Sequence, residues 1–267
     1  MIRNPSVAGQ FYPDDPAVLR AEVARLIKPA EPRIEARMVV SPHAGYMYSG
    51  AVAGAVYGRL EPPEVAVVLG PNHTGLGTRA ALVPYGAFLT PLGEVPVESE
   101  LAEEVLSRVD FVKDDALAHL YEHSLEVQLP FLQYIQPELS LVPLCLSRLS
   151  MEEILALGRG LAEAVRHYPR RVLLVASTDF SHYVPDRVAR EKDRLAIERI
   201  LELDSQGLVE VVWREDISMC GVIPTAVALE AARLLGASRG ELVKYATSGE
   251  VSGDYAQVVG YAGILIW

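Results

Sequence analysis

Short, continuous apolar runs separated by amphipathic segments are the feature that most constrains how this chain can fold. None of these runs alternates apolar with polar residues, and they span 38–40, 65–69, 139–146 and 172–175. Continuous runs of this length are typical of strands buried on both faces, as in parallel sheets covered by helices. The regular alternation of such runs with helical patterns predicts an α/β fold.

Capping and breaking residues mark the expected helices. Asp14-Asp15-Pro16 predicts a helix start, and the prolines at 29 and 32 predict its end. Other helical patterns cover 49–60, 98–108, 122–135, 150–167, 186–203 and a stretch from just after Cys220 to about 235. Short strands or a hairpin are expected over 79–97, and strands over 241–247 and 256–266.

No linker, composition shift or internal repeat divides the sequence. We therefore expect one domain over residues 1–267, with a mostly parallel, mixed central sheet and helices on both faces.

Charge and hydropathy disfavour nucleic acids and membranes as partners of this chain. The chain carries 35 acidic and 24 basic residues, a net charge of −11, which disfavours binding to a phosphate backbone. No apolar stretch reaches the roughly 18 residues needed to span a bilayer, and the first residues lack the basic-then-apolar layout of a secretory signal. The two cysteines are too few for a disulfide framework. We expect a cytoplasmic protein that binds neither nucleic acid nor membrane.

Histidines follow three of the expected strands. His43 comes after the strand at 38–40, His73 after 65–69, and His182 after 172–175. A single histidine in such a place is usually a turn or capping residue. Three in equivalent positions favour a functional site, because ligands of open α/β sheets bind at the carboxyl ends of the strands. Of the other histidines, His119 and His167 look incidental.

A cysteine and an aspartate are further candidates. Cys220 precedes an expected helix, whose dipole would favour the thiolate that binds metals or attacks substrates. The alternative is a buried, small apolar residue. Asp179 lies three positions before His182 and is well spaced to orient it, although a turn or capping role competes with this interpretation.

The segment Glu122-His123-Ser124-Leu125-Glu126 is expected to begin a helix. Glu122 and Glu126 would then share one face, so that one of them points into the site while His123 points elsewhere. As a pattern this is weak, because paired glutamates on a helix usually form a solvated face.

Five motifs together resemble the Memo family, whose bacterial and archaeal members are called AmmeMemoRadiSam system protein B. The opening residues, from Arg3 to Phe11-Tyr12-Pro13, match as well, so the resemblance covers nearly the whole chain. The motifs are Pro42-His43-Ala44-Gly45-Tyr46, Gly70-Pro71-Asn72-His73, Glu122 through Pro130, Ser177-Thr178-Asp179-Phe180-Ser181-His182 and Cys220-Gly221.

The resemblance implies a fold similar to the extradiol, non-haem iron dioxygenases. It implies His43, His73 and Cys220 as metal ligands, with Asp179 and His182 in the same pocket. By the same resemblance His182 is the catalytic acid/base, and Glu126 is a further pocket candidate. A thiolate here replaces the carboxylate that completes the dioxygenase iron site. Fe(II) is the first expectation for the ion, and copper or zinc are the alternatives.

Three functions remain open from the sequence. The first is a metal-dependent redox enzyme acting on a small molecule or peptide. The second is a non-catalytic module that binds a peptide or partner, since the resemblance implies association with radical-SAM and AMMECR-type proteins. The third is a hydrolase that uses Cys220 or a zinc ion. The sequence contains no phosphate-binding Gly-rich loop, Gly-x-Ser-x-Gly elbow or Cys-x-x-Cys pair, which disfavours nucleotide enzymes, α/β-hydrolases and structural zinc.

Overall fold

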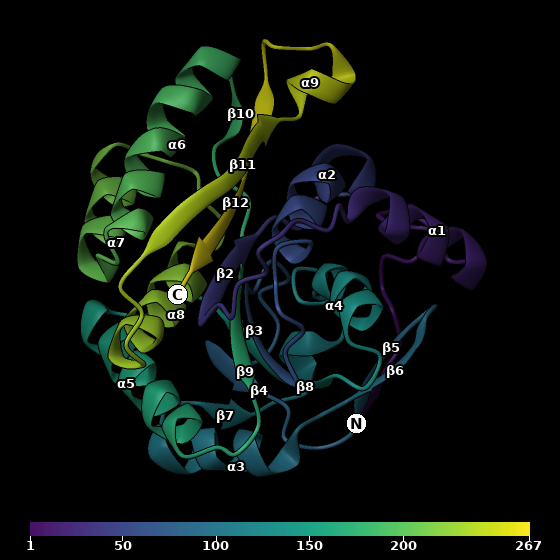
Figure 1. Cartoon of the computed structure of the whole chain (residues 1–267). Coiled ribbons are helices and arrows are strands. Elements are labelled where there is room, and N and C mark those ends of the chain that lie inside the picture. Colours follow the sequence, from purple (N-terminus) through teal and green to yellow (C-terminus); the bar gives the residue numbers. More distant parts are fainter.

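A mixed sheet of nine strands runs through the centre of the computed structural model, which describes residues 1–267 (Figure 1). Its middle is formed by four neighbouring parallel strands. In sheet order these are β2 (Met38–Ser41), β9 (Val172–Ser177), β3 (Val65–Pro71) and β8 (Ser140–Leu146). Every residue of β2, β3 and β8 is buried, as continuous apolar runs predict for strands covered on both faces.

Both edges of the sheet are antiparallel additions. On one side β12 (Val258–Ile266) pairs with β2, and β12 itself pairs with β11 (Gly240–Thr247) and β10 (His182–Val184). On the other side β4 (Ala80–Leu82) pairs antiparallel with β8, and β7 (Lys113–Asp114) pairs parallel with β4. The N-terminal strand β1 (Ile2–Arg3) joins a separate small sheet with the hairpin β5–β6, over Ala87–Thr90 and Gly93–Pro96.

Helices cover both faces of the large sheet (Figure 1). One face carries α3 (Ser99–Arg108), α5 (Met151–Arg166), α6 (Asp186–Leu201), α7 (Ser205–Arg214) and α8 (Val222–Leu234). The other carries α1 (Pro16–Leu26), α2 (Tyr46–Tyr57) and α4 (Leu129–Ile135). Three short elements complete the chain: the 3-10 turns η1 (Leu117–His119) and η2 (Glu126–Gln128), and α9 (Gly249–Ser252). The predicted α/β class, with a mixed sheet between two helical layers, is confirmed.

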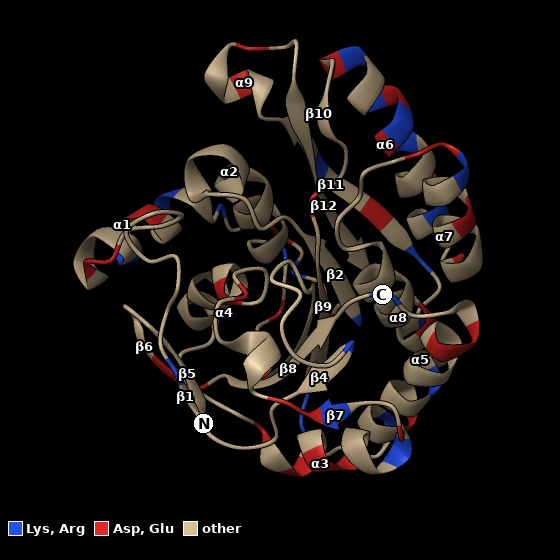
Figure 2. Ribbon diagram, turned by 180° about the vertical axis from the view of Figure 1, so that it is seen from behind, with Lys and Arg blue, Asp and Glu red and all other residues tan.

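A single cluster of 73 buried apolar residues holds these layers together. Helix α8 is buried along most of its length, whereas charged residues gather on the outer helices α3, α5, α6 and α7 (Figure 2). Helix α2 contains no charged residue and packs between α1 and the sheet. None of the helices combines the length and apolar character required to cross a membrane.

Most expected elements are present; apart from short elements such as β1, β7, β10 and α9, two longer segments differ from expectation. The side chain of Asp15 accepts hydrogen bonds from the amides of Ala17 and Val18, and so caps α1 as predicted. Helix α7 was not expected. The segment 122–125 is not helical, because the regular helix begins only at Leu129 after the turn η2. Glu122 and Glu126 therefore do not share a face of an α-helix.

Candidate metal centre

Three adjacent parallel strands bring polar residues to one edge of the sheet. His43 lies two positions past the end of β2, Asp179 two past β9, and His73 two past β3. Strand β9 lies between β2 and β3. Because the carboxyl ends of parallel strands meet at the same edge, these three residues converge on the place where open α/β sheets bind ligands.

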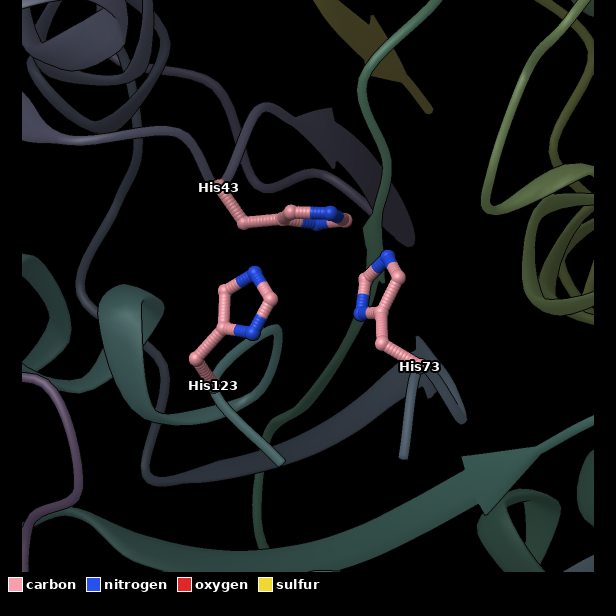
Figure 3. Close-up of side chains that lie close together, drawn as sticks. All are labelled: His43, His73 and His123. Atoms are coloured by element: carbon pink, nitrogen blue, oxygen red, sulfur yellow. The ribbon is translucent and has the colours of Figure 1, made fainter. Parts of the chain in front are cut away.

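The imidazole rings of His43, His73 and His123 face one another (Figure 3). Their ring centroids lie 5.2 Å apart for His43 and His73, 5.5 Å for His43 and His123, and 4.7 Å for His73 and His123. One ligand atom from each ring lies within 4.8 Å of the other two, which is compatible with a shared metal ion. Burial, together with the neighbouring histidines, holds the pKa of His43 well below its usual value, so this ring is a neutral donor.

The hydrogen bonds around Ser177 fix the tautomer of His43. The single hydroxyl proton of Ser177 is donated to the carbonyl oxygen of Ser124, at 2.6 Å. The same oxygen accepts from the side-chain amide of Gln128, at 2.7 Å. It must therefore also accept from Nδ1 of His43, 2.9 Å away. The proton of His43 lies on Nδ1, and its Nε2 presents a lone pair.

Glu122 fixes His73 in the same way. One carboxylate oxygen accepts from the backbone amide of His73 at 2.6 Å, and the other from its Nδ1 at 2.9 Å. A carboxylate only accepts, so Nδ1 of His73 carries a proton, and whenever the ring is neutral its lone pair lies on Nε2. Burial alone would raise the pKa of Glu122, but the hydrogen bond and charge of His73 outweigh burial and lower the pKa to about 2.

Cys220 contacts His43 and Asp179, the residues that follow β2 and β9. Its Sγ lies 3.3 Å from Nε2 of His43 and accepts from the backbone amide of Asp179 at 3.2 Å. Burial, reinforced by the charge of Asp179, raises the pKa of the thiol to about 12. The adjacent Gly221 has no room for a side chain, since an added Cβ would lie 2.5 Å from the carbonyl oxygen of Ser177.

Asp179 and His182 complete the polar residues of the site. The carboxylate of Asp179 accepts from the backbone amide of His43 at 2.9 Å, and burial raises its pKa to about 6. Nδ1 of His182 donates to the carbonyl oxygen of Ser218 at 2.8 Å. The bond to Ser218 therefore fixes the ring of His182 through Nδ1, and Nε2 is the nitrogen that can accept a proton.

A cavity of about 330 Å³ lies over these residues. Its lining includes the three clustered histidines, Asp179 and His182, together with aromatic and apolar side chains such as Phe11, Met47, Tyr48 and Tyr183. No lysine or arginine lines it. The cavity lining thus offers imidazole nitrogens and the Asp179 carboxylate, and the thiol of Cys220 contacts His43 outside this lining.

The residues singled out from the sequence are placed as follows. His43, His73, Asp179 and His182 line the cavity, and Cys220 contacts His43 beneath it. Glu126 does not line the cavity. Its buried carboxylate instead pairs with Arg3.

The expectation that His123 points elsewhere is wrong. It assumed helical spacing from residue 122 onward, whereas the chain at 122–125 forms a turn that directs this ring toward His43 and His73. The role of Glu122 in holding His73 was also missed. No local signal marked this turn, because the spacing of the glutamates and the apolar residues that follow fit a helix.

The chain is similar to proteins of known sequence and structure. A family profile described as "Memo-like protein" matches residues 3–265. A MEMO1 family protein of Methanopyrus kandleri is 46% identical, over 99% of each chain, and one of Aquifex aeolicus is 43% identical, over 99% of this chain and 98% of the relative. The crystal structure of an uncharacterized protein from Escherichia coli K12 superposes with a TM-score of 0.56 at 14% identity. It covers 85% of this chain and 98% of the other, so the likeness concerns the fold.

Proposed function

The chain belongs to the Memo family, and on this premise we propose that it is a metal-dependent redox enzyme. His43, His73 and Cys220 bind one transition-metal ion, with Fe(II) as the expected metal and copper or zinc as alternatives. Asp179 and His182 serve proton transfer to a small-molecule or peptide substrate in the cavity.

The observation that carries the proposal is the pair of fixed tautomers. Ser177 and Glu122 accept the Nδ1 protons of His43 and His73, respectively, so the Nε2 of each neutral ring is the nitrogen that can bind a metal. The Nε2 of His43 lies 3.3 Å from Sγ of Cys220, which would share the same ion. Histidine ligands of metals are typically held in this way, by an acceptor behind the ring that fixes its orientation and raises its basicity.

The distance between Cys220 and His43 is compatible with a shared ion, whereas the donor atoms that all lie within 4.8 Å of one another belong to His43, His73 and His123. For a tetrahedral ion with a sulfur ligand at about 2.3 Å and a nitrogen at about 2.0 Å, the two donor atoms lie roughly 3.6 Å apart. Sγ of Cys220 lies 3.3 Å from Nε2 of His43, close to that separation. His123 faces the same space and is the competing third ligand, or a fourth.

The donor set suits a transition metal. Two imidazoles and a thiolate favour a borderline or soft ion over Mg²⁺ or Ca²⁺, and three protein ligands leave coordination positions open. When bound, an iron or copper ion supplies one-electron chemistry that no side chain of this cavity offers. The basic Nε2 of His182 can take up a proton from a substrate, while its Nδ1 remains bonded to Ser218.

The test is anaerobic purification followed by elemental analysis and Co(II) substitution, comparing wild type with Cys220→Ala and His123→Ala. We expect about one ion per chain in wild type, with a sulfur-to-cobalt charge-transfer band in the near ultraviolet. Cys220→Ala should lose the band and most of the affinity, and His123→Ala should keep the band. A chain without metal, or a band and affinity unchanged in Cys220→Ala, would overturn the assignment.

A non-catalytic binding module is the second candidate. Met47 and Tyr183 line the cavity with 66% and 73% of their surface exposed, as partner-binding aromatic and methionine residues often are. Under this proposal the chain acts in the cytoplasm and binds a radical-SAM or AMMECR-type protein there. A tight complex that survives Cys220→Ser, without turnover of any substrate, would favour this function over the redox enzyme.

The geometry gives no support to a cysteine nucleophile. The pKa of about 12 keeps the thiol of Cys220 protonated at neutral pH when no metal is bound. The Nδ1 of His182 is bonded to Ser218, and the imidazole nitrogen that contacts the sulfur belongs to His43. Zinc as the bound metal, in place of iron or copper, would favour a zinc-dependent hydrolase.

A further inference from the structure

The N-terminal segment lies between the loop that carries His43 and the turn that carries His123. The carbonyl oxygen of Phe11 accepts from the backbone amide of Tyr46, at the end of the loop that bears His43. On its other side, the ring of Phe11 meets the ring of His123 edge-on, with centroids 5.0 Å apart. Residues far apart in sequence are thus joined through the start of the chain.

The carboxylate of Glu126 is the centre of this junction. It is fully buried and receives five hydrogen bonds from four residues of the N-terminal segment. The donors are Nη1 of Arg3 at 2.5 Å, the amide and hydroxyl of Ser6 at 2.8 and 3.1 Å, the amide of Val7 at 3.1 Å, and the hydroxyl of Tyr12. These donors fill the acceptor sites of the carboxylate, and each bond fixes one point of the N-terminal segment.

The guanidinium of Arg3 holds the opposite side of the junction. Its Nε donates to the carbonyl oxygen of His119 at 2.9 Å, and its Nη2 donates to the carbonyl oxygen of Glu122 at 2.6 Å. Arg3 therefore fixes the backbone of the residue whose carboxylate orients His73 and which directly precedes His123. The planar fork of arginine makes this three-way contact, and a lysine could not.

We propose that Arg3 and Glu126 are positioning residues of the metal centre: through Glu122 and His123 they hold one side of the ligand cluster in place. This inference rests on the proposed metal-binding function. A buried ion pair is a poor source of stability compared with apolar residues of equal volume, but it selects one geometry. Here that geometry is the path of residues 119–126.

The matched test compares Glu126→Gln with Glu241→Gln. Glu241 forms a two-point ion pair with Arg59, at 2.9 and 3.2 Å, and neither residue lines the cavity. For each variant the affinity for Zn²⁺ is measured against a competing chelator. The tautomers of His73 and His123 are read from imidazole nitrogen shifts in the metal-free protein, and thermal unfolding is followed in parallel.

We expect Glu126→Gln to weaken Zn²⁺ binding about 10- to 100-fold, the usual effect of losing support behind a metal ligand. His73 should also lose its single Nδ1–H tautomer, a change that a merely stabilising ion pair would not cause. Glu241→Gln should lower the melting temperature at most, with wild-type affinity and tautomers. Tyr12→Phe removes one of the five bonds and should give a smaller change in the same direction. This variant provides the test if Glu126→Gln does not fold.

Unchanged affinity and unchanged imidazole shifts in folded Glu126→Gln and Tyr12→Phe would overturn the positioning role. A wild-type protein that binds no Zn²⁺, with disturbed His73 tautomers in Glu126→Gln, would instead overturn the proposed function and retain the positioning of the histidines.

Discussion

Glu122 holds His73 at two points, with one carboxylate oxygen on the backbone amide and the other on Nδ1 of the ring. The two bonds fix both the position of the residue and the direction of its Nε2. Because the carbonyl oxygen of Glu122 is itself bonded to Arg3, this orientation depends on contacts that extend away from the cavity. These contacts come from the protein's own residues and hold the ring in one orientation, which lowers the cost of binding an ion there.

Glu122→Gln should weaken metal binding about 10- to 100-fold. The glutamine has one acceptor oxygen for the two N–H groups of His73, so one bond is lost and the side-chain NH₂ faces a donor. Titration with Zn²⁺ against a competing chelator measures the loss. The exposed Glu152 on α5 provides the control, since Glu152→Gln should bind like wild type. Equal affinities for the two variants would show that Glu122 does not support His73.

Ser177→Ala should release the ring of His43 and destabilise the protein by about 1–3 kcal/mol, because buried donors and an acceptor lose their common partner. The groups left behind are the carbonyl oxygen of Ser124, the amide of Gln128 and Nδ1 of His43. Urea unfolding gives the stability, and imidazole nitrogen shifts give the tautomer. Ser107→Ala removes an exposed hydroxyl on α3 and should be neutral. A retained Nδ1–H tautomer in Ser177→Ala would contradict the role assigned to Ser177.

The strand ends were predictable because their signal is local. Each of the runs before His43, His73 and Asp179 is apolar along its length, and a turn-rich sequence follows it. Parallel pairing then brings these residues to one edge without further information. The sheet position of β9 between β2 and β3, which sets which side chains become neighbours, depends on long-range packing and has no local signature.

The segment around His123 could not be predicted by the same means. Its spacing of glutamates fits a helix, but the tertiary contacts of Arg3 with the carbonyl oxygens of His119 and Glu122 accompany a turn instead. The buried contacts of Arg3, which lies more than a hundred residues earlier in the sequence, override the local preference for a helix. In that network Glu122 accepts a hydrogen bond from His73, and Glu126 forms an ion pair with Arg3.

Gly221→Ala should destabilise the protein by about 1–3 kcal/mol and disturb Cys220. The new methyl group would lie 2.5 Å from both the carbonyl oxygen of Ser177 and the Cβ of Thr178, so the turn that carries Cys220 must move. Gly45→Ala is the steric control, because its Cβ would have no neighbour closer than 3.6 Å. Urea unfolding of both variants checks the difference. Equal stabilities would mean that the backbone at Cys220 is not confined.

The stabilising effect of Glu126 should depend on pH in the acid range. Burial alone would raise the pKa of its carboxyl group, but the charge of Arg3 and the hydrogen bonds from Ser6 and Tyr12 outweigh burial and lower it. A carboxyl group whose pKa is lower in the folded than in the unfolded chain stabilises the fold above the unfolded value of about 4.3, and this stabilisation disappears as pH falls through the folded value.

The difference in melting temperature between wild type and Glu126→Gln should therefore be constant from pH 7 to about 5 and shrink below about pH 4. Near neutral pH the difference reflects a broken buried ion pair, worth roughly 3–5 kcal/mol. Other carboxyl groups titrate in both proteins and cancel in the comparison. Thermal unfolding between pH 7 and 2.5 gives the profile. A difference that stays constant to the lowest pH would show that the ionised form of Glu126 contributes nothing beyond its shape.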